Sequence, residues 1–160
     1  MNAGVPVITE AQAVTMVSGV NAIWSTCNIA FELEKYQAVN PADYGFDYNT
    51  NWTADAGMVR SAFKETNKMV MIAVGTLTGS TIAVTQMPGS GPYGLLVEKA
   101  YAQNPMTVGH ELGHYLGLYH ISNSSNLMNA YIGSNTKGLS TSQCATAQET
   151  QGDYWTKMLR

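Results

Sequence analysis

The stretch "TVGHELGHYLGLYH", from Thr107 to His120, contains every histidine of this chain of 160 residues. The three histidines are His110, His114 and His120, so all of them fall within eleven positions. Side chains four residues apart on an α-helix leave the same face about one turn apart. If the stretch is helical, His110 and His114 therefore present their imidazoles side by side.

The residues around the stretch predict a helix with defined ends. Asn104 is a favourable helix cap, and Pro105 suits the first turn, where a missing N–H costs nothing. Gly117 permits the left-handed backbone that ends a helix and reverses the chain. His120 follows three residues later, so the returning chain can bring it back toward the other two histidines.

Together the three histidines predict a metal site. Two ring nitrogens one helical turn apart can reach the same Zn²⁺ ion at about 2.0–2.1 Å, and His120 supplies a third ligand. Three protein ligands leave a fourth position open for water, which is typical of catalytic zinc. Glu111 projects roughly a quarter turn from His110 and is expected to face that water. The alternative is a chance pattern with exposed or carbonyl-bonded imidazoles, but the third spaced histidine favours the metal.

The rest of the chain predicts an α+β domain. Thr9 with Gln12, and Ser140 with Gln143, form capping-box patterns that start a first and a last helix. Alternating or short apolar runs predict strands, and Asn, Asp, Pro and Gly mark the loops between them. The expected helices cover about residues 9–27, 54–65, 104–117 and 140–158, the expected strands 28–36, 68–77, 80–86 and 93–101, and a long loop 38–53.

Composition restricts the classes of partner. Only 12% of the residues are charged and the net charge is -3, with no basic run for nucleic acid or anionic lipid. No apolar run approaches the roughly 18 residues of a membrane span. The opening "MNAGVPVITE" lacks the basic and apolar regions of a signal peptide. The chain is therefore either intracellular or a mature domain without its leader, and its low charge favours a secreted or periplasmic protein.

The segment "HELGHYLGLYH" resembles the extended zinc-binding motif of the metzincin metallopeptidases. In "SSNLMNAY", Met128 is similar to the methionine of the turn that follows this motif in the family, although a plain core methionine is the alternative. The resemblance implies a zincin-like α+β fold: a small twisted mixed sheet, an N-terminal helix, an active-site helix and a C-terminal helix. It also implies one catalytic domain over residues 1–160, with an upper subdomain of about 1–117 and a lower subdomain of about 118–160.

The resemblance further implies a zinc-dependent endopeptidase, monomeric, with Glu111 as general base and a peptide or protein as substrate. Tyr131 is a candidate contact for the oxyanion or the substrate, which would lie antiparallel to an edge strand, expected at 80–86. A catalytically weak or inactive peptide-binding module is the alternative, and the retained Glu111 favours the enzyme. Calcium is conceivable at Asp43 and Asp47, but turn formation explains these residues as well.

The two cysteines, Cys27 and Cys144, lie at the ends of two predicted helices. An even pair in a chain with few charges suits an exported protein. Some metzincins tie the C-terminal helix to the N-terminal part of the domain, so the resemblance implies a disulfide between Cys27 and Cys144. Two buried free thiols are the alternative.

Overall fold

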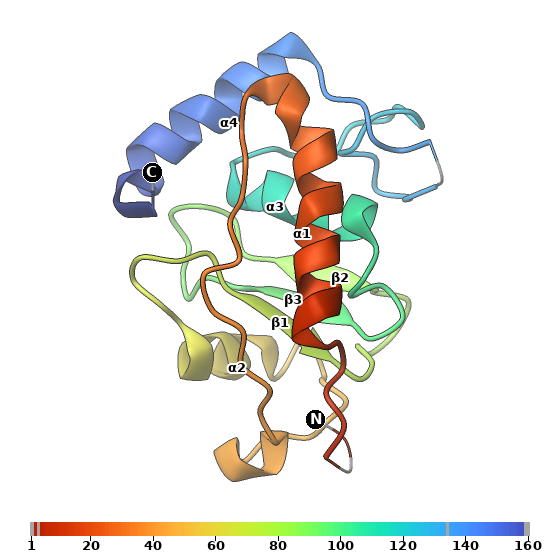
Figure 1. Cartoon of the computed structure of the whole chain (residues 1–160), viewed down its shortest axis with the longest axis vertical. Helices are drawn as coiled ribbons and strands as arrows, with labels where there is room; N and C mark the ends of the chain where they lie inside the picture. Colours follow the sequence, from red (N-terminus) through yellow and green to blue (C-terminus); the bar gives the residue numbers. More distant parts are fainter. Residues whose placement is uncertain (1, 3, 134, 159–160) are drawn as a thin grey trace.

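The computed structural model describes residues 2, 4–133 and 135–158 of the chain. The described residues form four α-helices, three strands and three short 3₁₀ turns (Figure 1). In chain order the helices and strands are α1 (Glu10–Trp24), α2 (Ala56–Phe63), β1 (Met71–Val74), β2 (Ala83–Thr85), β3 (Leu95–Glu98), α3 (Pro105–Tyr115) and α4 (Thr141–Tyr154).

Local capping sets the start of three helices. In α1 and α4 the predicted capping boxes are confirmed, because Thr9 and Ser140 each bond reciprocally with the glutamine three residues later. The side chain of Asn104 accepts hydrogen bonds from the N–H groups of Met106 and Thr107 and so caps α3. Each cap satisfies N–H groups that have no partner within the first turn of a helix.

The sheet is small and mixed, with the strand order β1-β3-β2. Strand β1 runs parallel to β3, and β2 runs antiparallel to it, which confirms the expected mixed sheet. Leu95, Leu96 and Val97 of the central strand are all fully or almost fully buried, so both faces of the sheet are covered. The three predicted strands in this region are confirmed, each shorter than its apolar run.

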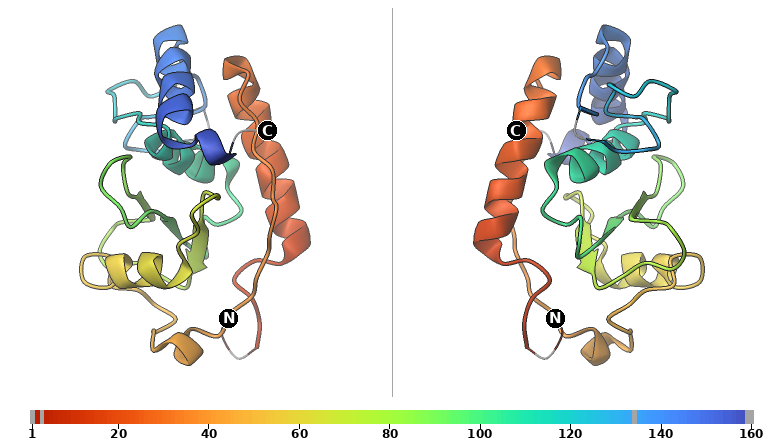
Figure 2. Two further views of the ribbon diagram at one scale, coloured as in Figure 1. Left: turned by 90° about the vertical axis from the view of Figure 1, so that its left-hand side faces the viewer. Right: turned by 90° about the vertical axis from the view of Figure 1, so that its right-hand side faces the viewer.

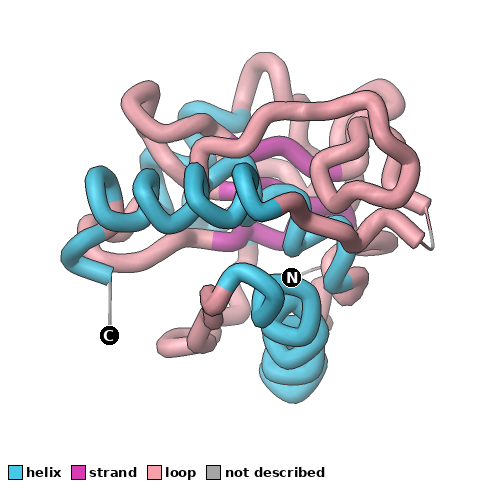
Figure 3. The backbone as a smooth tube through the Cα atoms, turned by 90° about the horizontal axis from the view of Figure 1, so that it is seen from above, coloured by secondary structure: helices cyan, strands magenta, loops and turns pink. Residues whose placement is uncertain are grey.

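Helix α3 packs on one face of the sheet and α1 packs against α3, whereas α2 covers the other face (Figures 1 and 2). Two indole groups connect the helical layers. Trp24 of α1 donates its ring N–H to the carbonyl of Gly109 on α3 (3.1 Å), and Trp155 donates to the carbonyl of Tyr115 (2.9 Å). Viewed from above, α4 lies across the molecule on the same side of the strands as α3 (Figure 3). Helix α3 is therefore fixed between α1, α4 and the sheet.

The predicted strand at 28–36 is wrong, because this segment runs alongside α1 and joins no strand of the sheet. The amide of Asn21 accounts for the difference. It accepts from the N–H of Phe31 (2.8 Å) and donates to its carbonyl (2.9 Å), so these groups do not pair with a strand.

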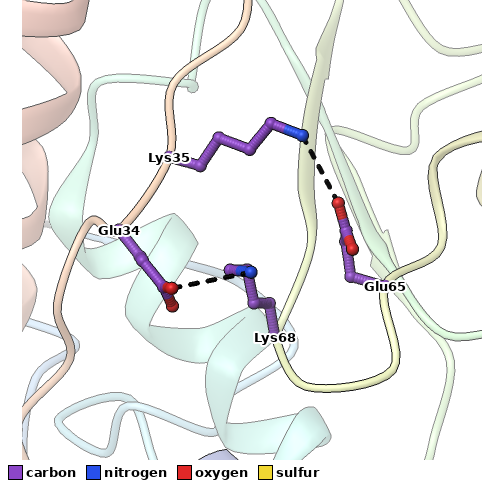
Figure 4. Close-up of polar contacts among 4 residues, drawn as sticks. All are labelled: Glu34, Lys35, Glu65 and Lys68. Carbon is purple, nitrogen blue, oxygen red and sulfur yellow. Dashed lines mark hydrogen bonds and ion pairs between the residues drawn. The ribbon is translucent and has the colours of Figure 1, made fainter.

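Side chains hold the 28–36 segment to the residues that precede β1 (Figure 4). Lys35 pairs with Glu65, and Glu34 pairs with Lys68, each across 3.5 Å. A cavity of about 740 Å³ is lined by residues of this segment, α1, β1 and α3. Exposed ion pairs of this kind contribute little to the stability of the fold. They hold the backbone of the segment in position.

A disulfide joins Cys27, at the end of the 3₁₀ turn that follows α1, to Cys144, in the first turn of α4, which confirms the predicted bond. It links positions 117 residues apart in the sequence. None of the described helices combines the length and the apolar character that a membrane span requires.

Candidate metal centre

The structure brings the three histidines together at the C-terminal half of α3. His110 and His114 project from the helix one turn apart, and His120 approaches from the segment that follows it. The Nε2 atom of His110 lies 3.1 Å from that of His114 and 3.1 Å from that of His120, and the third distance is 3.2 Å. No other group of three potential ligand residues is present in the described part of the chain.

Backbone carbonyls fix the orientation of two of the rings. Nδ1 of His110 lies 2.7 Å from the carbonyl oxygen of Leu127, and Nδ1 of His114 lies 2.7 Å from that of Leu118. A carbonyl oxygen only accepts, so each Nδ1 carries the proton and donates it. The Nε2 atoms of both rings are therefore unprotonated and direct lone pairs toward the same point. In histidine metal sites a hydrogen bond from the other ring nitrogen fixes the tautomer and the ring orientation in the same way.

Burial keeps these rings neutral. It lowers the pKa of His110 to about 4, against the opposing effect of the hydrogen bond to Leu127. It also lowers the pKa of His114 below its ordinary value. Neutral imidazole is the form that binds a metal, so the pocket favours the ligand state of both side chains over protonation.

The donor set fits Zn²⁺. Two ligands at about 2.05 Å from a tetrahedral ion stand roughly 3.3 Å apart, which is close to the separations of the Nε2 atoms. Converging lone pairs without protons between them repel each other, and a cation at their centre removes that repulsion. Neither Asp43 nor Asp47, the residues considered for calcium, belongs to a group of three potential metal ligands among the described residues. Asp43 instead accepts a hydrogen bond from the side chain of Asn40 (3.1 Å).

The turn after α3 depends on one glycine. Gly117 has a φ of +78°, in the left-handed region that favours glycine. This conformation lets Leu118 donate its N–H back to the carbonyl of Gly113 (2.9 Å) while its own carbonyl faces His114. The same turn directs the chain toward His120, so the predicted role of Gly117 in reversing the chain agrees with its backbone geometry.

Glu111 lies beside the histidines but is almost completely buried, with 5% of its surface exposed. Burial raises the pKa of its carboxyl group to about 7, while the hydroxyl of Thr85 and the charge of Arg60 act in the opposite direction. Thr85 donates to Oε2 of Glu111 across 2.6 Å. Among the described residues only Thr85 hydrogen-bonds to this carboxylate, which leaves Oε1 for another donor.

Neither Thr85 nor Arg60 is predicted as a site residue from the sequence. Arg60 of α2 is buried, and it donates to the carbonyls of Gly94 (2.8 Å) and Val84 (3.1 Å). The sequence does contain a signal for Arg60. This residue lies next to Val59 and three residues before Phe63, so it is a charged residue on the apolar side of the predicted helix. No sequence signal identifies Thr85, which meets Glu111 from a strand 26 residues away.

Met128 is fully buried. Its N–H donates to the side chain of Asn126 (2.9 Å), and its carbonyl accepts from Ile121 (2.9 Å), so a compact turn holds it next to the segment of His120. Tyr131 lies at the surface, with 88% of its area exposed. Its backbone N–H donates to Asn129, and its phenol makes no hydrogen bond to the described residues.

Comparison with known proteins gives a family and a fold. The sequence profile of the peptidase family M10, matrixin, matches residues 27–150. The crystal structure of metalloproteinase-II from Bacteroides fragilis is similar to this chain with a TM-score of 0.61 and 13% identity. The alignment covers 89% of this chain but 48% of the Bacteroides chain, so this chain spans about half the length of that protein. A comparison with curated protein sequences gave no match.

Proposed function

The chain belongs to the matrixin family of metalloendopeptidases, and we propose that it hydrolyses peptide bonds with one Zn²⁺ ion and with Glu111 as general base. The observation that carries this proposal is the convergence of three imidazole Nε2 atoms next to a buried carboxylate. A site with three neutral nitrogen ligands and an adjacent acid–base group has the parts that metal-assisted hydrolysis requires.

His110, His114 and His120 hold the metal in this proposal. When bound, Zn²⁺ acidifies a water molecule and polarises the carbonyl of the scissile bond. The carbonyls of Leu118 and Leu127 keep two of the rings in the ligating tautomer. Met128 supports the site from below, as the methionine of the turn does in metzincins.

Glu111 moves the proton. Because Thr85 occupies only Oε2 of the buried carboxylate, Oε1 is available to accept a proton and to release it again. Oε1 accepts the proton of the attacking water, and the carboxyl group then passes it to the leaving amine. General-base catalysis of this kind contributes about 10²–10⁴-fold to the rate.

We place the substrate along β2, which is an edge of the sheet. An extended peptide that pairs with this strand gains backbone hydrogen bonds independent of its side chains, which suits a protein or peptide substrate. The exposed ring of Tyr131 is the proposed additional contact to the substrate or the oxyanion. We further propose a monomer and a secreted or periplasmic location, which the disulfide supports.

The proposal includes one catalytic domain over residues 1–160, divided near residue 117 into an upper and a lower subdomain. Residues 1, 3, 134 and 159–160 of this range lie outside the described residues. The active-site helix belongs to the upper part, and His120 with Met128 to the lower part.

The test compares the parent, Glu111→Gln and the exposed control Glu149→Gln, each loaded with zinc, on a diverse peptide pool read by mass spectrometry. Parent and control should cut the same peptides, whereas Glu111→Gln should lose at least about 100-fold in rate and keep its zinc. Equal rates in parent and Glu111→Gln would exclude the general base. Loss of zinc from Glu111→Gln would indicate that Glu111 is a metal ligand and not the general base. A parent that binds peptides without cutting them would be a peptide-binding module.

A further inference from the structure

We propose that Thr85 is the residue that positions Glu111 for catalysis, by holding one carboxylate oxygen so that the other faces the histidine cluster. This inference rests on the proposed function, because it assigns a role to a neighbour of the general base. Thr85 touches neither the histidines nor the reacting atoms, so it is a positioning residue and not a catalytic one.

Thr85 contacts Glu111 directly. Thr85 Oγ1 lies 2.6 Å from Oε2 of Glu111, which is short for a hydroxyl donor and indicates a charge-assisted hydrogen bond. Glu111 is 5% exposed, so little solvent is available to replace this donor. A buried carboxylate without it could rotate about its last torsion, because terminal torsions of this type are broad.

A buried arginine holds the strand that carries Thr85. Residue 84 precedes Thr85 in β2, and its carbonyl accepts a hydrogen bond from Arg60 Nη2 (3.1 Å). Arg60 Nε donates at the same time to the carbonyl of Gly94, just before β3 (2.8 Å). The guanidinium thus joins β2 to the start of the central strand with two donors in a fixed fork.

The close packing around Arg60 makes this support specific. Gly94 has a φ of +153°, and a β-carbon at this position would lie 3.1 Å from Cγ of Arg60. Arg60 is itself buried, with 6% of its surface exposed. A buried guanidinium that satisfies two backbone carbonyls is costly to move, so β2 keeps its distance from α3.

The register of the sheet fixes the position of Thr85 relative to α3. Thr85 is paired with Leu95 of β3, and its side chain reaches α3 on the face that carries Glu111. A hydroxyl at this one position of β2 therefore sets the direction of the carboxylate. The substrate is expected to use the backbone of the same strand, so substrate binding and the direction of the base share one element.

The test uses Thr85→Val, which removes the hydroxyl and keeps the shape, and Thr85→Ser, which restores it. Thr107→Val is the matched control, since the Thr107 hydroxyl is fully buried, lies one turn before Glu111 and has no partner among the described residues. Thermal unfolding of each variant confirms that it is folded before kinetics are measured.

With zinc-loaded protein, Thr85→Val should lower kcat about tenfold or more and leave KM unchanged within about twofold, because one hydrogen bond to a charged group is lost and no substrate contact is removed. Thr85→Ser should return to within about threefold of the parent, and Thr107→Val should match the parent. A rise in KM alone, an unchanged kcat in Thr85→Val, or an equal loss in Thr107→Val would overturn the assignment.

A second readout does not depend on activity. Crystal structures of the parent and of Thr85→Val, both with zinc, should show the Glu111 carboxylate in one orientation in the parent and turned or disordered in the variant. The same orientation in both structures would overturn the inference. If the parent cuts no peptide at all, the proposed function fails, and this comparison still decides the role of Thr85.

Discussion

The sulfur of Met128 lies directly against the α-carbon of Gly113, so that a β-carbon on residue 113 would meet this sulfur and would lie 3.1 Å from the methyl carbon of the same methionine. Gly113 immediately precedes His114 on α3, and His110 lies three residues before it. The absence of a side chain at position 113 thus permits the contact between the histidine helix and the turn of Met128.

Gly113→Ala should therefore lower the free energy of unfolding by about 1–3 kcal/mol, because an added methyl group overpacks a buried contact. Urea unfolding measures the loss. Gly152→Ala in α4 is the control, since a β-carbon there meets nothing within 4 Å, and a helical alanine in place of glycine should raise stability by about 1 kcal/mol. Equal effects of the two substitutions would mean that the Met128 contact does not restrict position 113.

His120→Ala should leave a site with two ligands and reduce the affinity for Zn²⁺ by at least about 100-fold, since even the loss of an outer partner costs about 10–100-fold. Metal analysis after dialysis against a weak chelator checks this, with about one zinc per chain expected in the parent. Tyr119→Ala, at the exposed neighbouring residue, should retain the metal. Stoichiometric tight zinc in His120→Ala would contradict the ligand set.

Glu111 should make the metal-free protein less stable at high pH. Burial raises the pKa of its carboxyl group from 4.5 to about 7, so the folded state binds the proton more tightly than the unfolded chain. Each increase in pH between about 4.5 and 7 then lowers the free energy of unfolding. Without zinc, the free energy of unfolding of Glu111→Gln should exceed that of the parent by about 3 kcal/mol at pH 8 and by little at pH 4.5.

The histidines act on stability in the opposite direction. Burial holds the pKa of His110 at about 4, below its ordinary value of 6.5, so stability is lost as the pH falls through this interval. Because parent and Glu111→Gln share this effect, their difference isolates the carboxyl group. A difference that does not change between pH 4.5 and pH 8 would contradict the burial argument. Chemical denaturation at both pH values gives the four free energies needed.

Removing the disulfide should destabilise the protein. The bond joins cysteines 117 positions apart in the sequence, and in the chain-entropy model a loop of this length is worth about 4–5 kcal/mol. The double variant Cys27→Ala with Cys144→Ala should therefore unfold at a markedly lower urea concentration than the oxidised parent. Parent protein kept in a reducing agent is the control, and it should unfold at a urea concentration close to that of the variant. Two reactive thiols in the unreduced, denatured parent would show that the bond does not form.

The sequence predicts the parts of the fold and site that depend on local spacing. The pairs Thr9 with Gln12 and Ser140 with Gln143 identify two helix starts because a capping box needs only neighbouring residues. The three histidines come together because one helix and one turn bring them there. Such features need no knowledge of distant segments.

Long-range contacts explain the failures. Apolar and polar residues alternate around Phe31 as in a half-buried strand. However, the side-chain amide of Asn21 hydrogen-bonds to both the N–H and the carbonyl of Phe31, and the hydrophobic pattern of the sequence does not reveal this contact. The bond between Thr85 and Glu111 depends on the packing of α3 against β2. Tertiary packing decides such contacts, and it overrides local propensity.

The bond between Cys27 and Cys144 also makes residues 27–144 a closed covalent ring that contains the three strands of the described residues and the whole of α3. A single cut anywhere in this ring leaves both pieces attached to each other. If one molecule of the peptidase cleaves another at an exposed loop, where nicking is most frequent, the product still migrates as one chain until it is reduced. A single self-cleavage within the ring thus leaves the mass seen on a non-reducing gel unchanged, and a preparation that looks intact can consist of nicked two-piece molecules.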